Sequence, residues 1–198
     1  MTKGRLEAFS DGVIAILITI MVLELKVPHG SDLNALRPLL PVFLGYVLSF
    51  VYLGIYWNNH HHMLQASKHV NGAVMWANLH LLFWLSLVPT ATTWVGEHPA
   101  ATGPTALYGF LLFMSGAAYT ILQRALMRID GNHAILARAF GLDLKGRFTP
   151  VLYVAGIATS FVRPWIGQAF YLLVALIWLV PDPRIERELI RLHGHENG

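Results

Sequence analysis

The sequence contains no cysteine, so it can form neither a disulfide nor a thiolate metal site, and cysteine nucleophiles are excluded. Charged residues are also scarce: they make up 13% of the 198 residues, about half the fraction usual in soluble domains. Hydrophobic residues, in contrast, make up 55% of the chain, and the mean hydropathy is +0.52. A globular core of this size cannot cover so much apolar surface, so we expect lipid to be the solvent for much of the chain.

Further absences narrow the possible functions. No run of lysine and arginine with interleaved aromatic residues is present, so the sequence gives no sign of a nucleic-acid partner. The metalloprotease pattern, the glycine-rich phosphate loop and the nucleophile elbow are all missing, which predicts that the chain is not an enzyme and needs no cofactor. His60, His61 and His62 are consecutive, and on a helix they point about 100° apart, so we predict no metal site there.

Six apolar segments separated by proline, glycine and polar residues fill most of the chain. They cover residues 5–27, 36–62, 70–95, 104–127, 148–162 and 165–180. The first four exceed the ~20 residues that a helix needs to cross a bilayer. We therefore predict one all-α domain over residues 1–198, a polytopic membrane protein with about six transmembrane helices. The last two segments are short and flank Arg163-Pro164, so two spans, one broken helix and a re-entrant pair all fit them.

The basic residues predict how the chain is oriented. Of the 14 lysine and arginine residues, 11 fall on the side of the membrane that also holds the N-terminus. Only Lys26, Arg37 and Arg163 fall on the opposite side. Because cytoplasmic loops carry an excess of these residues, we predict that both termini are cytoplasmic and that the number of spans is even.

The first segment carries polar and apolar residues on different faces. A carboxylate within a membrane helix is costly unless it has a partner, so Asp11 requires one. At about 100° per residue, Ile16, Ile20 and Leu23 form one stripe along the helix. Ser10 and Asp11 lie on the opposite side. One face must therefore contact a polar interior, and the other either an apolar neighbour or a narrow pore.

Three short strings, at the start of the first segment, at the end of the second and within the third, carry a family resemblance. They are Phe9-Ser10-Asp11 preceded by Arg5, Trp57-Asn58-Asn59-His60 and Asn78-Leu79. In these strings and in its length the chain resembles the transmembrane-protein-175 family of potassium channels, whose shorter members are bacterial. The resemblance implies a homotetramer in a bacterial cell membrane, in which the first helix of each subunit lines a central pore. K⁺ and other monovalent cations are then the permeant ions.

The resemblance also implies roles for individual residues. Carried over to this sequence, the ion pathway comprises Ile16, Thr19, Ile20 and Leu23, with Ile16 at a hydrophobic constriction. A structural polar network behind the pore helix comprises Arg5, Phe9, Ser10, Asp11, Trp57, His60 and Asn78.

Other interpretations stay open on the residues alone. An apolar stripe with helical spacing is more often a packing surface than a pore. A secondary, proton-coupled transporter is one alternative function, although such proteins usually contain internal repeats, and none is visible here. A membrane scaffold that conducts nothing is another. Glu24, beside the stripe, suits either an outer vestibule or a surface carboxylate near Lys26.

Overall fold

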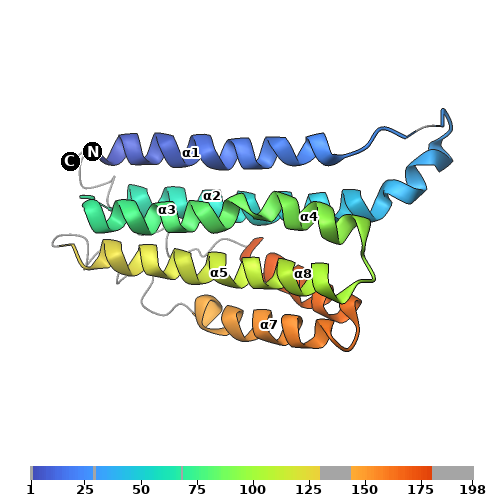
Figure 1. The fold of residues 1–198 in the computed structure, drawn as a ribbon. Coiled ribbons are helices and arrows are strands. Elements are labelled where there is room, and N and C mark those ends of the chain that lie inside the picture. Colours follow the sequence, from blue (N-terminus) through green and yellow to red (C-terminus); the bar gives the residue numbers. More distant parts are fainter. Residues whose placement is uncertain (1, 29, 68, 130–143, 180–198) are drawn as a thin grey trace.

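The computed structural model describes residues 2–28, 30–67, 69–129 and 144–179, and these residues form helices joined by short connections. Figure 1 shows the helices running side by side along one common direction. Four of them are long and apolar enough to cross a membrane, namely Lys3–Glu24, Leu33–Gln65, Gly72–Glu97 and Thr102–Met127. The basic connector over residues 130–143 and residue 180, the last of the predicted sixth segment, lie outside the described residues.

Three of the four membrane-length helical rods combine an α-helix with a second, shorter helix. The elements are α1 (Lys3–Ile20), η1 (Met21–Glu24), η2 (Leu33–Leu39), α2 (Leu40–Gln65), α3 (Gly72–Ser86), α4 (Val88–Glu97), α5 (Thr102–Met127), α7 (Leu144–Ser160) and α8 (Pro164–Leu179). Helix starts follow local chemistry: proline, which lacks an amide donor, occupies the first turn of α2 and of α8. The Asn71 side chain caps α3 by accepting a hydrogen bond from the Val74 amide at 3.0 Å.

The predicted segment 70–95 is divided in the structure. One helix, α3, ends at Ser86, and α4 begins at Val88 with Pro89 in its first turn. Proline cannot donate the hydrogen bond that would continue the helix, and its ring crowds the carbonyl four residues earlier. The two helices together still form one membrane-length rod, Gly72–Glu97.

The two short helices at the end of the described chain form an antiparallel pair. After α7 the chain turns at residues 161–163, and α8 returns beside it (Figure 1). Pro164 begins α8, so the Arg163-Pro164 step lies at the turn between two helices. The structure therefore has two separate helices here instead of one continuous helix with a break.

Tyr171 of α8 lies at the centre of the packing between α2, α5, α7 and α8. The side chain is fully buried, and its hydroxyl donates to the Thr105 carbonyl at 3.2 Å. The hydroxyl of Tyr52 donates to the Tyr171 carbonyl at 2.5 Å. Gly109 and Gly156 leave room for the ring, because a Cβ atom at either position would overlap it. The packing between α2, α5, α7 and α8 is thus centred on the side chain of Tyr171, away from α1.

Candidate functional site

The α1 rod has one face against the protein and one face that the protomer leaves uncovered. The buried face comprises Leu6, Ser10, Ile14 and Leu17 of α1 and Met21 of η1. On the other face, Ile16, Ile20 and Leu23 are 59%, 39% and 79% exposed. Neither α2 nor any other described helix of the same protomer covers this stripe.

Thr19 is exposed on the same uncovered face. Its hydroxyl donates to the backbone of its own helix, with the Ala15 and Ile16 carbonyl oxygens both 3.0 Å away. A hydroxyl that donates its single hydrogen inward keeps its oxygen lone pairs facing outward. The stripe therefore carries one hydroxyl oxygen, that of Thr19, between apolar side chains.

A fully buried hydrogen-bond chain holds the opposite face of α1. The Asn78 amide of α3 donates to the Ser10 hydroxyl at 2.8 Å, and Ser10 donates to the Leu6 carbonyl at 2.8 Å. The Asn78 oxygen lies 2.7 Å from Nε2 of His60 on α2. Because an amide oxygen can only accept, Nε2 of His60 must carry the hydrogen. Ser10, His60 and Asn78 are each fully buried, so α1, α2 and α3 are joined by one polar chain within apolar surroundings.

A second, partly exposed set of contacts joins α1 to α2. The Trp57 indole N–H donates to Oδ1 of Asp11 at 3.0 Å, which gives this carboxylate the partner that the sequence requires. One turn further along α2, the His61 ring stacks on Trp57, with 6.1 Å between ring centroids. Nδ1 of His61 lies 3.7 Å from Oε1 of Glu7. The sequence interpretation did not include the Glu7–His61 pair, although both residues stand beside members of the predicted network.

Two residues of the predicted network lie elsewhere. Arg5 is exposed and makes no hydrogen bond or ion pair with any described residue. Phe9 is 49% exposed. It precedes Ile16 by seven residues, two helical turns, so it lies on the uncovered face. Arg5 and Phe9 thus lie apart from the rest of the predicted network. The structure brings the other members together on the protein-facing side of α1: Ser10, Asp11, Trp57, His60 and Asn78.

The far end of the α1 rod has a different attachment. Nζ of Lys26, just beyond η1, lies 2.7 Å from Oε1 of Glu97 at the end of α4, and both side chains are exposed. The Glu97 carboxylate raises the pKa of Lys26, and Glu24 adds to the effect, so Lys26 stays charged at neutral pH. Exposed pairs of this kind contribute little to stability.

A hydroxyl cluster between α2, α4 and α5 was also absent from the sequence interpretation. Oγ of Ser49 lies 2.6 Å from Oγ1 of Thr92 and 2.8 Å from the Tyr108 hydroxyl. Thr92 already donates to the Val88 carbonyl at 2.7 Å, so Ser49 must donate to Thr92, and Tyr108 must donate to Ser49. The signal in the sequence is a hydroxyl-bearing residue within each apolar segment, which does not reveal how these residues pair.

Comparison with known proteins gives consistent matches. Residues 5–89 match the family model described as the endosomal/lysosomal potassium channel TMEM175. A potassium channel from a Chryseobacterium species is 59% identical over 189 residues, covering 96% of this chain and 98% of the relative. A potassium channel from Streptomyces collinus is 36% identical and covers 93% and 96% of the two chains. The crystal structure of a lysosomal potassium-selective channel TMEM175 homologue from Chamaesiphon minutus superposes with a TM-score of 0.75, at 30% identity, over 89% of this chain and 95% of that one. The predicted all-α membrane fold with about six helices is thereby confirmed.

Proposed function

Because this chain belongs to the TMEM175 family of potassium channels, we propose that it forms a potassium-permeable channel in a bacterial cell membrane. Family membership confirms the resemblance that the sequence predicts and agrees with the prediction that the chain is not an enzyme. The bacterial relatives match nearly the whole chain and are themselves described as potassium channels, which supports carrying this function over.

The observation that carries the proposal is the uncovered stripe on α1. Ile16, Ile20 and Leu23 are exposed in the protomer, while Ser10 on the opposite face is fully buried. In a membrane the stripe must face either lipid or other protein. In our proposal it faces the same stripe on other copies of the chain around a symmetry axis. Four copies then surround a pore lined by Ile16, Thr19, Ile20 and Leu23.

Ile16 forms the narrowest ring in this proposal. A ring of apolar side chains that is too narrow to stay wet blocks ions, and a small widening or rotation readmits water and a partly hydrated ion. Selectivity then comes from the cost of removing water from the ion, offset in part by the Thr19 hydroxyl oxygens. The polar chain at Ser10 fixes the rotation of α1, and Ile16 lies six residues, about 9 Å, further along the helix.

Planar-bilayer recording of the purified full chain tests conduction. With K⁺ on one side and Na⁺ on the other, we expect discrete single-channel currents that reverse towards the K⁺ equilibrium potential. Slow, saturable flux without unitary events contradicts a channel and indicates a carrier. The absence of any flux from protein that is folded and inserted indicates a scaffold.

The orientation of the chain is a separate proposal, in which both termini are cytoplasmic. The end of the molecule where α1 begins and α5 ends (Figure 1) carries Lys3 and Arg124, and Nζ of Lys3 donates to the Gln65 carbonyl at the end of α2. Basic residues gather on the cytoplasmic side of membrane proteins. This end is therefore assigned to the cytoplasm.

The absence of native cysteine makes this orientation directly measurable. A single Ala100→Cys substitution, in the exposed connection between α4 and α5, is expected to react with a membrane-impermeant maleimide in intact cells. A Thr2→Cys variant is expected to react only after the membrane is permeabilised, because residue 2 precedes α1 at the opposite end of the bundle. The reverse labelling pattern overturns the orientation without affecting the proposal of conduction.

A further inference from the structure

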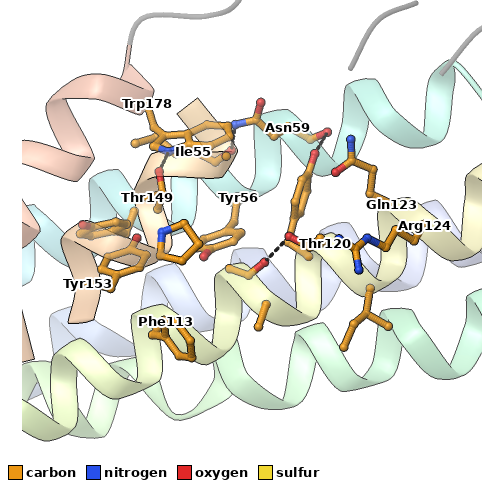
Figure 2. A pocket seen from close by; sticks show the side chains of 17 residues that line it. Ile55, Tyr56, Asn59, Phe113, Thr120, Gln123, Arg124, Thr149, Tyr153 and Trp178 are labelled. Carbon is orange, nitrogen blue, oxygen red and sulfur yellow. Dashed lines mark hydrogen bonds between the residues drawn. The ribbon is translucent and has the colours of Figure 1, made fainter. Parts of the chain in front are cut away.

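A cavity of about 350 Å³ lies between α2, α5, α7 and α8, apart from the proposed pore helix (Figure 2). Its volume falls within the range of about 300–1,000 Å³ that is typical of ligand sites. None of the residues assigned to the ion pathway or to the polar network lines it. The cavity is therefore unexplained by the proposed function.

The cavity changes in character along the direction of the helices. Phe113 and Tyr153 form aromatic walls at one end, while Gln123 and Arg124 lie at the other (Figure 2). Phe113 and Arg124 are both on α5 and are separated by eleven residues, about 16 Å along the helix axis. Arg124 stands close to Met127, the last residue of α5, and so near the membrane surface. The polarity of the cavity thus changes from apolar to cationic in the direction from the membrane interior to its surface.

The side-chain donors of Tyr56, Gln123 and Arg124 at this cavity have no partner in the described part of the chain. Tyr56 is only 9% exposed, yet its hydroxyl makes no hydrogen bond with a described residue. The exposed guanidinium of Arg124 likewise meets no carboxylate among those residues. Trp178 does have a partner: its indole N–H donates to the Thr149 hydroxyl at 2.9 Å, and this bond is visible in Figure 2. The Tyr56 hydroxyl is not among the fully buried atoms, so it is open to the cavity and can donate to an acceptor on a bound ligand.

We propose that this cavity binds an anionic phospholipid, with one acyl chain between the aromatic walls and the headgroup phosphate at Arg124. Two of the helices around it, α2 and α5, belong to membrane-length spans, so phospholipid is a ligand present at high concentration. Guanidinium groups form strong, charge-assisted hydrogen bonds with phosphate, and basic sites between helices bind anionic headgroups. The Tyr56 hydroxyl donates to an ester carbonyl below the headgroup. This proposal depends only on membrane insertion, and it holds whether or not the chain conducts K⁺.

Gly116 offers a way to fill the cavity without disturbing its walls. A Cβ atom at Gly116 would lie 3.7 Å from the Tyr56 hydroxyl and 3.8 Å from Cε2 of Tyr153, which are ordinary contact distances. A leucine there occupies the space of the acyl chain. Arg124→Gln instead removes the charge and keeps the cavity. Arg128→Gln is the matched control, because Arg128 is exposed one turn further along and does not line the cavity.

Native mass spectrometry of the full chain, delipidated and then titrated with phosphatidylglycerol or phosphatidylcholine, tests the proposal. Both lipids carry a phosphate, but the choline ammonium neutralises the net charge of phosphatidylcholine, so we expect the unaltered protein to bind phosphatidylglycerol about tenfold more tightly. Arg124→Gln should remove this preference, Gly116→Leu should remove binding of both lipids at this site, and Arg128→Gln should change neither.

Several outcomes overturn the proposal. Equal binding of both lipids by the unaltered protein excludes an anionic headgroup site. Equal losses from Arg124→Gln and Arg128→Gln indicate a diffuse attraction between the basic surface and the membrane instead of a site. If Gly116→Leu is folded, as judged by its helical circular dichroism, and still binds as before, the acyl chain does not occupy the cavity. If Gly116→Leu does not fold, the comparison between the two arginine variants decides the question.

Discussion

Replacing Ile16 with alanine is expected to raise the single-channel conductance and to bring the permeabilities for K⁺ and Na⁺ closer together. Ile16 is 59% exposed on the uncovered face of α1, so the change opens no cavity inside the protomer. If four such side chains form the constriction, their truncation widens the ring and lowers the cost of wetting it. Loss of only 1.4 kcal/mol from the barrier corresponds to about a tenfold increase in ion flow.

The matched control for this change is Leu172→Ala. Leu172 lies on α8 and is 50% exposed, so it loses a similar amount of apolar surface without belonging to the stripe. We expect its conductance and its reversal potential under a K⁺/Na⁺ gradient to equal those of the unaltered protein. Unchanged currents in Ile16→Ala, from protein that assembles normally, remove Ile16 from the ion pathway, although they leave open a constriction elsewhere.

Of the substitutions proposed here, Asn78→Leu is expected to cause the largest loss of folding stability. The side chain keeps its size but loses both hydrogen bonds of the buried chain, those to Ser10 and to His60. The N–H of His60 is then buried without an acceptor, which costs about 1–3 kcal/mol. We expect a lower temperature of thermal unfolding in detergent, measured by circular dichroism. We also expect α1 to rotate more freely about its own axis.

Asn58→Leu makes the same chemical change at a half-buried position of α2 for which no side-chain hydrogen bond is present among the described residues, and we expect little effect from it. A second His60→Leu change should partly restore the stability of Asn78→Leu, because it removes the orphaned donor. Strictly additive losses in the double variant, or equal unfolding temperatures for Asn58→Leu and Asn78→Leu, contradict the assignment of the buried chain as the anchor of α1.

The two faces of α1 were predictable because helical periodicity fixes which side chains share a direction. Ser10 had to be separated from Ile16, whatever surrounds the helix. Contacts between helices were harder to predict from the sequence. Arg5 precedes Ile16 by eleven residues, about three helical turns, so the same periodicity places it on the side of the stripe, and its assignment to the network came from the family resemblance instead. The role of the stripe as a pore stays a prediction, since a single protomer contains no facing copy.

Features formed by several helices could not be predicted from the sequence, because they depend on which residues of different helices come together. The cavity has walls from α2, α5, α7 and α8, and each of its residues is unremarkable within its own apolar segment. Gly116 reads as an ordinary helical glycine until Tyr56 and Tyr153 are seen beside it. Pro89 is similar: its position within an apolar run hid the division between α3 and α4.

The two ends of the α1 rod are held by contacts that respond differently to dissolved salt. The buried Ser10–Asn78 bond involves no net charge and is shielded from ions, whereas the exposed Lys26–Glu97 pair is screened as ionic strength rises. A rising salt concentration is therefore expected to weaken the contact at Lys26 and to leave the bond at Ser10 unchanged. Leu23 stands about 20 Å from Ser10 along the axis and Ile16 about 9 Å, so a tilt of the helix about Ser10 would displace Leu23 roughly twice as far as Ile16.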